Sequence, residues 1–399
     1  MIPVNEPLLD GNEKKYLAEC IDTGWISSEG PFVKKFEEKF AAQVGRKHGI
    51  AVCNGSVALD AAVAALSICS GDEVIMPTFT IISCAAAVVR AGAIPVVVDC
   101  EPDTWNMDMG QIEDKITSRT KAIMVVHIYG LPVDMDPVIS LAEKYGLKII
   151  EDAAEAHGLV YRSRGRRAEG GGQRSEDRSR RSEVRGQRTE GGRRPCGSFG
   201  DISTFSFYPN KLITTGEGGM IVTDNEELAE RCRSLRNLCF QPQKRFVHEE
   251  LGWNFRFTNL QAAVGLAQLE KLDEHIKRKL RMGELYTELL SEIPELQLPL
   301  PITDYAENIY WVYGMVLKDH VPFDAEEAMR RLKKKGIGTR PFFWPMHEQP
   351  VFKRMGLFEN EKYPVAERIA RRGFYIPSGL TMTKEQIDRV CEAVRKVLI

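Results

Sequence analysis

Two hydrophobic periodicities alternate along the chain from residue 49 onward, and this alternation restricts the fold more than any other feature. Short, continuous apolar runs are typical of strands that are buried on both faces. Such runs lie at residues 49–54, 72–77, 94–100, 121–130 and 147–154. Helical patterns separate them, at residues 57–71, 81–93 and 135–146. A repeat of strand, helix and strand predicts an α/β protein whose mainly parallel sheet is covered by helices and binds ligands at the carboxyl ends of its strands.

The pattern becomes mostly helical in the C-terminal part. Helical periodicity covers residues 259–293, 320–337 and 383–398. We therefore expect a large domain over residues 1–258 and a smaller C-terminal α/β domain over residues 259–399. A hinge between them is expected near residues 258–280.

An arginine-rich segment interrupts the large domain at residues 162–194. It contains 12 Arg and 5 acidic residues, and its only apolar side chains are Ala168 and Val184. A stretch with so few apolar groups cannot offset its ordering entropy, so we expect an inserted, solvated loop without fixed structure. An RNA-binding arm is the alternative, and it predicts retention of RNA that falls steeply with salt. If the segment is only a loop, deletion of residues 164–194 leaves cofactor binding intact.

The composition excludes several classes of protein. The chain has 399 residues, a formal net charge of −2 and 43% hydrophobic residues, so it offers no overall basic field for nucleic acid. No apolar run approaches the about 20 residues that span a membrane, and residues 1–16 lack the pattern of a secretion signal. The nine cysteines form no CxxC pair, and the seven histidines form no HxxxH pair. We expect reduced thiols, no metal site and a cytoplasmic protein.

Two stretches at strand ends carry candidate binding groups. Residues 52–62 are predicted to run from strand through Asn-Gly-Ser into helix, where backbone N–H groups and the Ser56 hydroxyl can hold a phosphate. Residues 151–158 place Asp152 and Glu155 at the end of a predicted strand. Taken alone, the first motif is weak and also fits an ordinary serine N-cap, and two acids alone would favour caps of the next helix.

The third stretch is FSFYPNKLITTGEGG at residues 205–219, where Lys211 follows an aromatic strand and precedes a glycine cluster. A lysine alone in such a place usually extends to solvent, but partial burial makes its amine a nucleophile. Together, a phosphate seat, an acid at a neighbouring strand end and this lysine are what pyridoxal 5'-phosphate (PLP) requires. The sequence contains neither GxGxxG after a strand nor GxxxxGK[ST], which are typical of dinucleotide and nucleoside triphosphate sites.

These stretches also carry a family resemblance. The motifs are WISSEGP, CNGSVAL, VVHIYGLPVDMDP, EDAAEA, FSFYPNKLITTGEGGMIVTDN, GWNFRFTNLQAA and TRPFFWPMH. With them the chain resembles, nearly end to end, the sugar-nucleotide aminotransferases of the DegT family, within the fold-type I PLP enzymes. The resemblance implies a large domain with a mainly parallel seven-stranded sheet and a smaller C-terminal α/β domain.

The resemblance also implies roles for individual residues. Lys211 would bind PLP as a Schiff base and shuttle the proton during transfer, and Asp152 would pair with the pyridine nitrogen. Glu155 would lie near the phenolic oxygen of the cofactor. The phosphate would be held by Gly55, Ser56 and Ser206, and by Asn254 of the neighbouring subunit.

The sugar nucleotide would lie near Ser27, Ser28 and Gly30 of WISSEGP and near His347. The implied reaction takes an amino group from L-glutamate, holds it as pyridoxamine phosphate and passes it to a nucleotide-linked 4-keto-6-deoxy sugar. GDP-4-keto-6-deoxy-D-mannose is favoured, as in lipopolysaccharide O-antigen biosynthesis, and another GDP, dTDP or UDP keto-sugar is the alternative. A homodimer with shared sites, or a tetramer, is implied, without nucleic acid or membrane.

Two departures from the family pattern and two rival functions matter. Many relatives have an aromatic residue at the position of Ile81 that stacks on the PLP ring, so that here Ile81 itself or Phe79 must serve. The second departure is the arginine-rich segment, which replaces a short hairpin.

A sugar dehydratase is disfavoured because its relatives carry histidine where Lys211 stands. A non-catalytic PLP-binding regulator or scaffold remains the alternative of another class, disfavoured by the lack of an N-terminal DNA-binding module.

Overall fold

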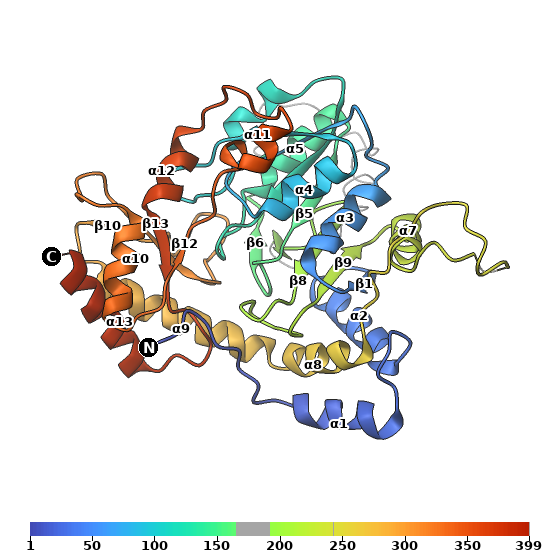
Figure 1. Ribbon diagram of the computed structural model, residues 1–399, viewed down its shortest axis with the longest axis horizontal. Helices are drawn as coiled ribbons and strands as arrows, with labels where there is room; N and C mark the ends of the chain where they lie inside the picture. The colour runs from blue at the N-terminus through green and yellow to red at the C-terminus, as the bar shows by residue number, and fades with distance from the viewer. Residues whose placement is uncertain (165–191, 242, 399) are drawn as a thin grey trace.

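Figure 1 shows the computed structural model, which describes residues 1–164, 192–241 and 243–398. At its centre lies a seven-stranded sheet in the order β1-β9-β8-β5-β4-β2-β3. The strands are β1 (His48–Val52), β2 (Glu73–Pro77), β3 (Ile94–Val98), β4 (Thr120–Val126), β5 (Lys148–Asp152), β8 (Ile202–Ser206) and β9 (Gly219–Thr223). Each of the five predicted apolar runs supplies one strand of this sheet, which confirms the α/β prediction.

The sheet is mainly parallel, because only β9 runs against its neighbours. Strand β2 is parallel to β3 and β4, β4 is parallel to β5, and β5 is parallel to β8. Strand β9 pairs antiparallel with both β8 and β1. The carboxyl ends of β4, β5 and β8 therefore meet at one edge, where Asp152 ends β5 and Ser206 ends β8.

Helices cover both faces of the sheet, and alternate strand residues face opposite ways. One face packs in a core with α3 (Gly55–Ala65), α4 (Ile82–Arg90) and α7 (Glu226–Arg236). The other face packs with α2 (Pro31–Gln43), α5 (Met135–Tyr145) and α8 (Asn259–Leu269). Helix α1 (Glu13–Thr23) lies outside α8. In β1, Ile50 and Val52 belong to the first core and Ala51 to the second, as the two-residue period of a strand requires.

The C-terminal elements form a second sheet with its own core. The four antiparallel strands are β10 (Leu296–Gln297), β11 (Tyr313–Leu317), β13 (Gly373–Ile376) and β12 (Arg340–Pro341). They lie with α9 (Leu272–Leu290), α10 (Ala325–Lys334), α12 (Pro364–Arg372) and α13 (Lys384–Leu398), while the short α11 (Pro350–Arg354) lies beside the main sheet. The N-terminal residue Ile2 joins this core and bridges to Ile337, so that the chain starts in the C-terminal part.

The helical pattern at residues 259–293 forms two helices, α8 and α9, and not one. Helix α8 packs against α1 and α2, whereas α9 packs against α13. The chain therefore passes from the main sheet to the second sheet between these two helices. The division into domains at residue 258 stays a prediction, although α8 keeps to the large part.

The ends of the arginine-rich segment form a hairpin. Strands β6 (Val160–Arg162) and β7 (Arg193–Pro195) pair antiparallel, with Arg162 opposite Arg193. The regular structure therefore extends into both ends of the predicted loop, and the prediction for residues 165–191 lies outside the described residues.

All nine cysteines are free. Within the described parts of the chain, no helix is long and apolar enough to cross a membrane.

Candidate active site

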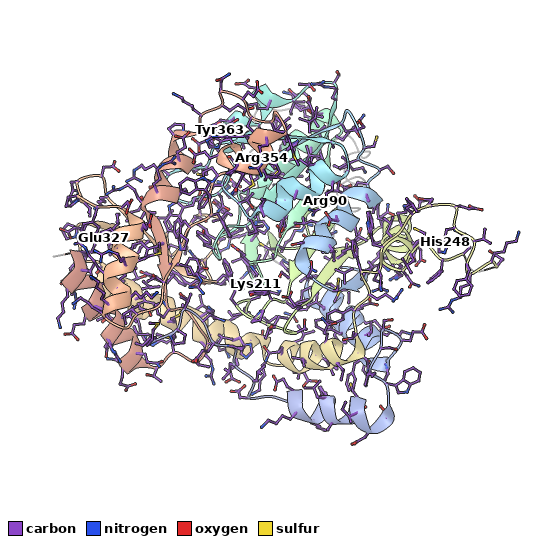
Figure 2. The ribbon with its side chains drawn as sticks, in the orientation of Figure 1. Arg90, Lys211, His248, Glu327, Arg354 and Tyr363 are labelled. Atoms are coloured by element: carbon purple, nitrogen blue, oxygen red, sulfur yellow. The ribbon has the colours of Figure 1, made fainter. Side chains whose placement is uncertain are left out.

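Lys211 lies in a loop between β8 and β9 that contacts from the C-terminal part hold in place. Trp311 Nε1 donates to the carbonyl of Asn210 at 2.8 Å, and His275 Nδ1 lies 3.1 Å from the carbonyl of Leu212. The Lys211 N–H donates to the carbonyl of Tyr208 at 2.9 Å. Figure 2 places Lys211 near the centre of the molecule. The backbone on both sides of the lysine is thus fixed by residues that follow it by many positions in the sequence.

The Lys211 side chain points inward, and its amine has a carboxylate and an indole as neighbours. Its Nζ lies 3.5 Å from Glu155 Oε1 and 3.8 Å from the centroid of the Trp311 ring. The side chain is 11% exposed. The sequence allowed two interpretations of Lys211, a nucleophile or a side chain that extends to solvent. The geometry favours the nucleophile, because the amine lies inside the protein.

Glu155 is buried, and the backbone of a strained residue holds it. Its Oε2 accepts from the Tyr129 N–H at 2.9 Å, and Tyr129 has φ +54°, in the left-handed region that costs energy for this residue type. Burial raises the pKa of Glu155 to about 7, although Lys211 and the Tyr129 N–H lower it. The Glu155 carboxyl can therefore gain or lose a proton near neutral pH.

Asp152 is the last residue of β5, and its carboxylate is fixed on both oxygens. Oδ1 accepts from the Ala154 N–H at 3.0 Å, and Oδ2 accepts from Cys84 Sγ at 3.2 Å. Asp152 is 2% exposed, and burial raises its pKa, although these two donors and the Lys211 charge lower it. A buried carboxylate of this kind fits a ring nitrogen that carries a proton and a positive charge, as the pyridine nitrogen of PLP does.

The three residues expected to hold the phosphate come together where β8 meets α3. Asn54 caps α3, with its side chain accepting from the Val57 N–H at 3.0 Å. A Cβ atom on Gly55 would lie 2.7 Å from Ser206 Cβ, so that only glycine fits between helix and strand. The Ser56 hydroxyl lies 2.7 Å from that of Ser83 at the start of α4. The start of α3, with these hydroxyl groups, is a cradle that fits a phosphate.

The WISSEGP segment is held close to α8 by one buried side chain. Asn259 donates through Nδ2 to the carbonyl of Trp25 at 2.7 Å, and its backbone N–H donates to the carbonyl of Ser27 at 2.8 Å. A Cβ atom on Gly30 would lie 2.1 Å from Asn259 Cγ, which explains the glycine at the start of α2. Ser28, half-buried, lines a surface cavity with Gly30 and α2. The role of this segment in substrate binding stays a prediction.

Asn254 and His347 lie in contrasting places. Asn254 is exposed on the strand-like segment before α8 and bridges to Asn237. His347 is buried, with its Nδ1 2.8 Å from Thr78 Oγ1 and its Nε2 3.2 Å from Glu367 Oε1. Both ring nitrogens thus have partners within the chain. The predicted roles of both residues stay predictions.

For the ring-stacking position, the two candidates differ in exposure. Phe79 is fully buried, in an aromatic cluster with Tyr129, Phe342 and Phe343. Ile81 is 41% exposed and caps α4. This favours Ile81 as the aliphatic contact with the ring.

His127 belongs to a buried network one layer behind the site. Its Nε2 lies 2.9 Å from Glu151 Oε1, and its Nδ1 accepts from the Val133 N–H at 3.1 Å. Glu151 also accepts from the N–H groups of Phe199 and Gly200 at 2.9 and 3.0 Å. Burial by itself raises the pKa of Glu151, but His127 and the Gly197 N–H lower it to about 2. These contacts give His127 a structural role that requires no metal.

The sequence motifs did not identify Trp311, Tyr129 or Cys84, which contact Lys211, Glu155 and Asp152 respectively. Trp311 is separated from Asn210 by 101 positions, and Cys84 from Asp152 by 68. The run NIYWVYG around Trp311 was a possible signal, because five of its seven residues are aromatic or β-branched, as is typical of a strand. Nothing in it specified contact with the lysine.

Comparison with known proteins agrees with this geometry. The profile of the DegT/DnrJ/EryC1/StrS aminotransferase family matches residues 7–395. The chain is 40% identical to the GDP-perosamine synthase of Caulobacter vibrioides over 398 residues, covering 100% of this chain and 98% of the relative. It is 38% identical to that of Escherichia coli O157:H7 over 396 residues, covering 99% and 98%.

Solved structures give the same result. The aminotransferase TlmJ from Streptoalloteichus hindustanus superposes with a TM-score of 0.85 at 28% identity, covering 100% of this chain and 99% of that one. NtdA from Bacillus subtilis, solved with bound cofactor PMP, superposes with a TM-score of 0.81 at 27% identity, covering 97% and 81%.

Proposed function

Because this chain belongs to the DegT/DnrJ/EryC1/StrS aminotransferase family and uses PLP, we propose that it moves an amino group from L-glutamate to a nucleotide-linked 4-keto-6-deoxy sugar. The substrate that we propose is GDP-4-keto-6-deoxy-D-mannose, and the product is GDP-perosamine. The observation that carries the proposal is the buried Lys211 amine, 3.5 Å from Glu155, at the sheet edge where Asp152 ends β5. The choice of sugar is supported by full-length similarity to two GDP-perosamine synthases.

In the proposed reaction, Lys211, Asp152 and Glu155 have different roles around the cofactor. PLP, when bound, supplies an electron sink that lowers the cost of removing a proton from carbon. With the cofactor bound, Lys211 Nζ would take the proton from the α-carbon of the donor in the first half-reaction and would deliver a proton to the sugar carbon in the second. Asp152 keeps the proton on the ring nitrogen. Glu155 holds the Lys211 amine in place, with its Oε1 3.5 Å from Nζ.

Several large apolar side chains are exposed near the candidate site. Trp25 and Trp253 are 49% and 38% exposed, and Leu251 is 92% exposed, all on segments next to the predicted substrate and phosphate residues. Tryptophan is enriched in protein–protein interfaces. We therefore propose a homodimer in which Asn254 of one subunit reaches the phosphate in the other.

Covalent trapping tests the role of Lys211. The wild-type protein is incubated with PLP, reduced with borohydride and digested, and the labelled peptide is identified by mass spectrometry. We expect the label on Lys211, and its loss in Lys211→Ala together with at least about a 10³-fold fall in transamination, because both proton transfer and covalent binding are removed. The exposed variant Lys244→Ala should behave as wild type. A label elsewhere, or none, would contradict the proposal.

A panel of substrates tests the sugar. The enzyme is loaded with pyridoxamine phosphate, offered GDP-, dTDP- and UDP-linked keto-sugars, and followed by the return of PLP absorbance. We expect a response to GDP-4-keto-6-deoxy-D-mannose. A response only to a dTDP or UDP sugar would leave the aminotransferase and replace its substrate, whereas no response to any keto-sugar would favour a non-catalytic regulator.

A further inference from the structure

A thiol contacts the Asp152 carboxylate, which the proposed function places beside the ring nitrogen of PLP. Cys84, on α4, donates through Sγ to Asp152 Oδ2 at 3.2 Å, while the Ala154 N–H donates to Oδ1 at 3.0 Å. Cys84 is 0% exposed and Asp152 is 2% exposed. The carboxylate is therefore fixed on both oxygens by donors from two different elements, and only one of these donors is a side chain.

The donor and acceptor in each hydrogen bond of Cys84 follow from the single proton of its thiol. A thiol has one proton, and an ionised carboxylate can only accept. Thr80 Oγ1 lies 3.5 Å from Cys84 Sγ, and Thr80 is buried as well. With the thiol proton directed at Asp152, the Thr80 hydroxyl donates to the sulfur. The three groups form a chain of donors that ends on the carboxylate.

The thiol keeps its proton under working conditions. Burial and the neighbouring Asp152 charge raise the pKa of Cys84 well above its ordinary value. The S–H donor therefore persists across the range in which a transaminase works. A thiol is a weaker donor than a hydroxyl, so it orients the carboxylate while withdrawing less charge from it.

We propose that Cys84 is a positioning residue for transamination, orienting the Asp152 carboxylate and setting how strongly that carboxylate holds the proton on the cofactor ring. The inference rests on the proposed function, because it requires PLP to meet Asp152. Cys84 itself touches neither substrate nor cofactor in this role, and acts only through Asp152.

Two substitutions separate the donor from the volume of the side chain. Cys84→Val keeps a similar volume and removes the donor, whereas Cys84→Ser keeps a donor and strengthens it. Cys232→Val is the matched control, because Cys232 is also 0% exposed and lies in the same core, on α7. All variants are purified with PLP and compared by thermal unfolding, by the pH titration of the absorbance of bound PLP, and by kcat and KM for glutamate.

We expect Cys84→Val to lower kcat about ten-fold with KM nearly unchanged, the size expected for a hydrogen bond to a charged group, and to move the midpoint of the absorbance titration. Cys84→Ser should restore kcat to within about three-fold and move the midpoint in the opposite direction, because the hydroxyl is the stronger donor. Cys232→Val should match the wild type in both.

An unchanged midpoint and kcat in Cys84→Val would overturn the inference. If that variant does not fold, Cys84→Ser decides alone: a displaced midpoint supports the inference and an unchanged midpoint overturns it. Failure of the wild-type protein to bind PLP would instead overturn the proposed function, so that the two failures are distinguishable.

Discussion

Lys211 and Glu155 form an ion pair almost closed to solvent, and each side chain is positioned by residues remote in sequence. Trp311 lies against the amine, and the strained Tyr129 backbone donates to the carboxylate. Gly130 allows this arrangement, because a Cβ atom there would lie 2.5 Å from the Trp311 backbone nitrogen. The strain at Tyr129 thus serves to place one N–H group where Glu155 needs it.

The titration of Glu155 predicts a pH dependence of stability in the cofactor-free protein. Its pKa is raised from 4.5 to about 7 in the folded state. The stabilisation of the folded state by this raised pKa is therefore complete below pH 4.5. The stabilisation is lost as pH rises toward 7, because the folded state retains a proton that the unfolded chain has released. In Glu155→Gln, the decrease in the free energy of unfolding between pH 4.5 and 7 should be smaller by up to about 3 kcal/mol.

Urea unfolding of the cofactor-free protein at several pH values measures this effect. Glu249→Gln, an exposed substitution, is the control and should leave the slope unchanged. An equal slope in Glu155→Gln and the wild type would show that Glu155 has an ordinary pKa.

At the scale of elements, the turn at residues 197–201 connects the hairpin to β8 and depends on Glu151 of β5. Glu151 accepts from the backbone N–H groups of this turn and contacts His127 at the end of β4. One buried side chain therefore joins the end of β4, the strand β5 and the start of β8. These are the strands whose carboxyl ends carry the site.

Glu151→Gln is expected to lower the free energy of unfolding by about 1.5–3 kcal/mol, because a neutral amide replaces a buried carboxylate that accepts several hydrogen bonds. The stabilisation by Glu151 should be present above pH 4.5 and be lost as pH falls toward 2, because its folded pKa is about 2. Urea unfolding at pH 7 checks the first statement and acid unfolding the second. The exposed substitution Glu359→Gln should cost less than about 0.5 kcal/mol, and a similar value for Glu151→Gln would contradict the prediction.

At the scale of the whole molecule, the hairpin β6–β7 keeps the ends of the arginine-rich segment together. The Ser163 N–H donates to the carbonyl of Gly192 at 3.0 Å, and Gly192 has φ +73°. Joining Arg164 to Gly192 would therefore leave a three-residue hairpin loop that already has glycine in the left-handed position. Arg164 remains paired with Asp304 at 3.0 Å.

Deletion of residues 165–191 should leave PLP binding unchanged and change the free energy of unfolding by no more than about 2 kcal/mol, since closure entropy depends weakly on loop length. The longer deletion, 164–194, also removes Arg194, which lies 4.2 Å from the centroid of the Phe199 ring, and should be less stable. Denaturation and PLP titration of both proteins provide the measurement. Loss of PLP from the shorter deletion would show that the segment supports the site.

The sequence alone determined five strands of the central sheet and singled out candidate residues at its edge. Apolar runs and helical periods repeat locally, so they predicted all five strands from β1 to β5, and the motifs identified Lys211, Asp152 and Glu155. The break between α8 and α9 was not predicted, because both helices continue one amphipathic pattern across Glu270 and Lys271.

Only the tertiary structure brought Trp311 to Lys211, Cys84 to Asp152 and the Tyr129 N–H to Glu155. Each of these contacts joins parts of the chain that no local period relates. Their geometry depends on how the second sheet packs on the first and on how α4 lies against β5. Local patterns decide which residues reach the edge of the sheet, whereas packing between distant segments decides the environment in which their protons move.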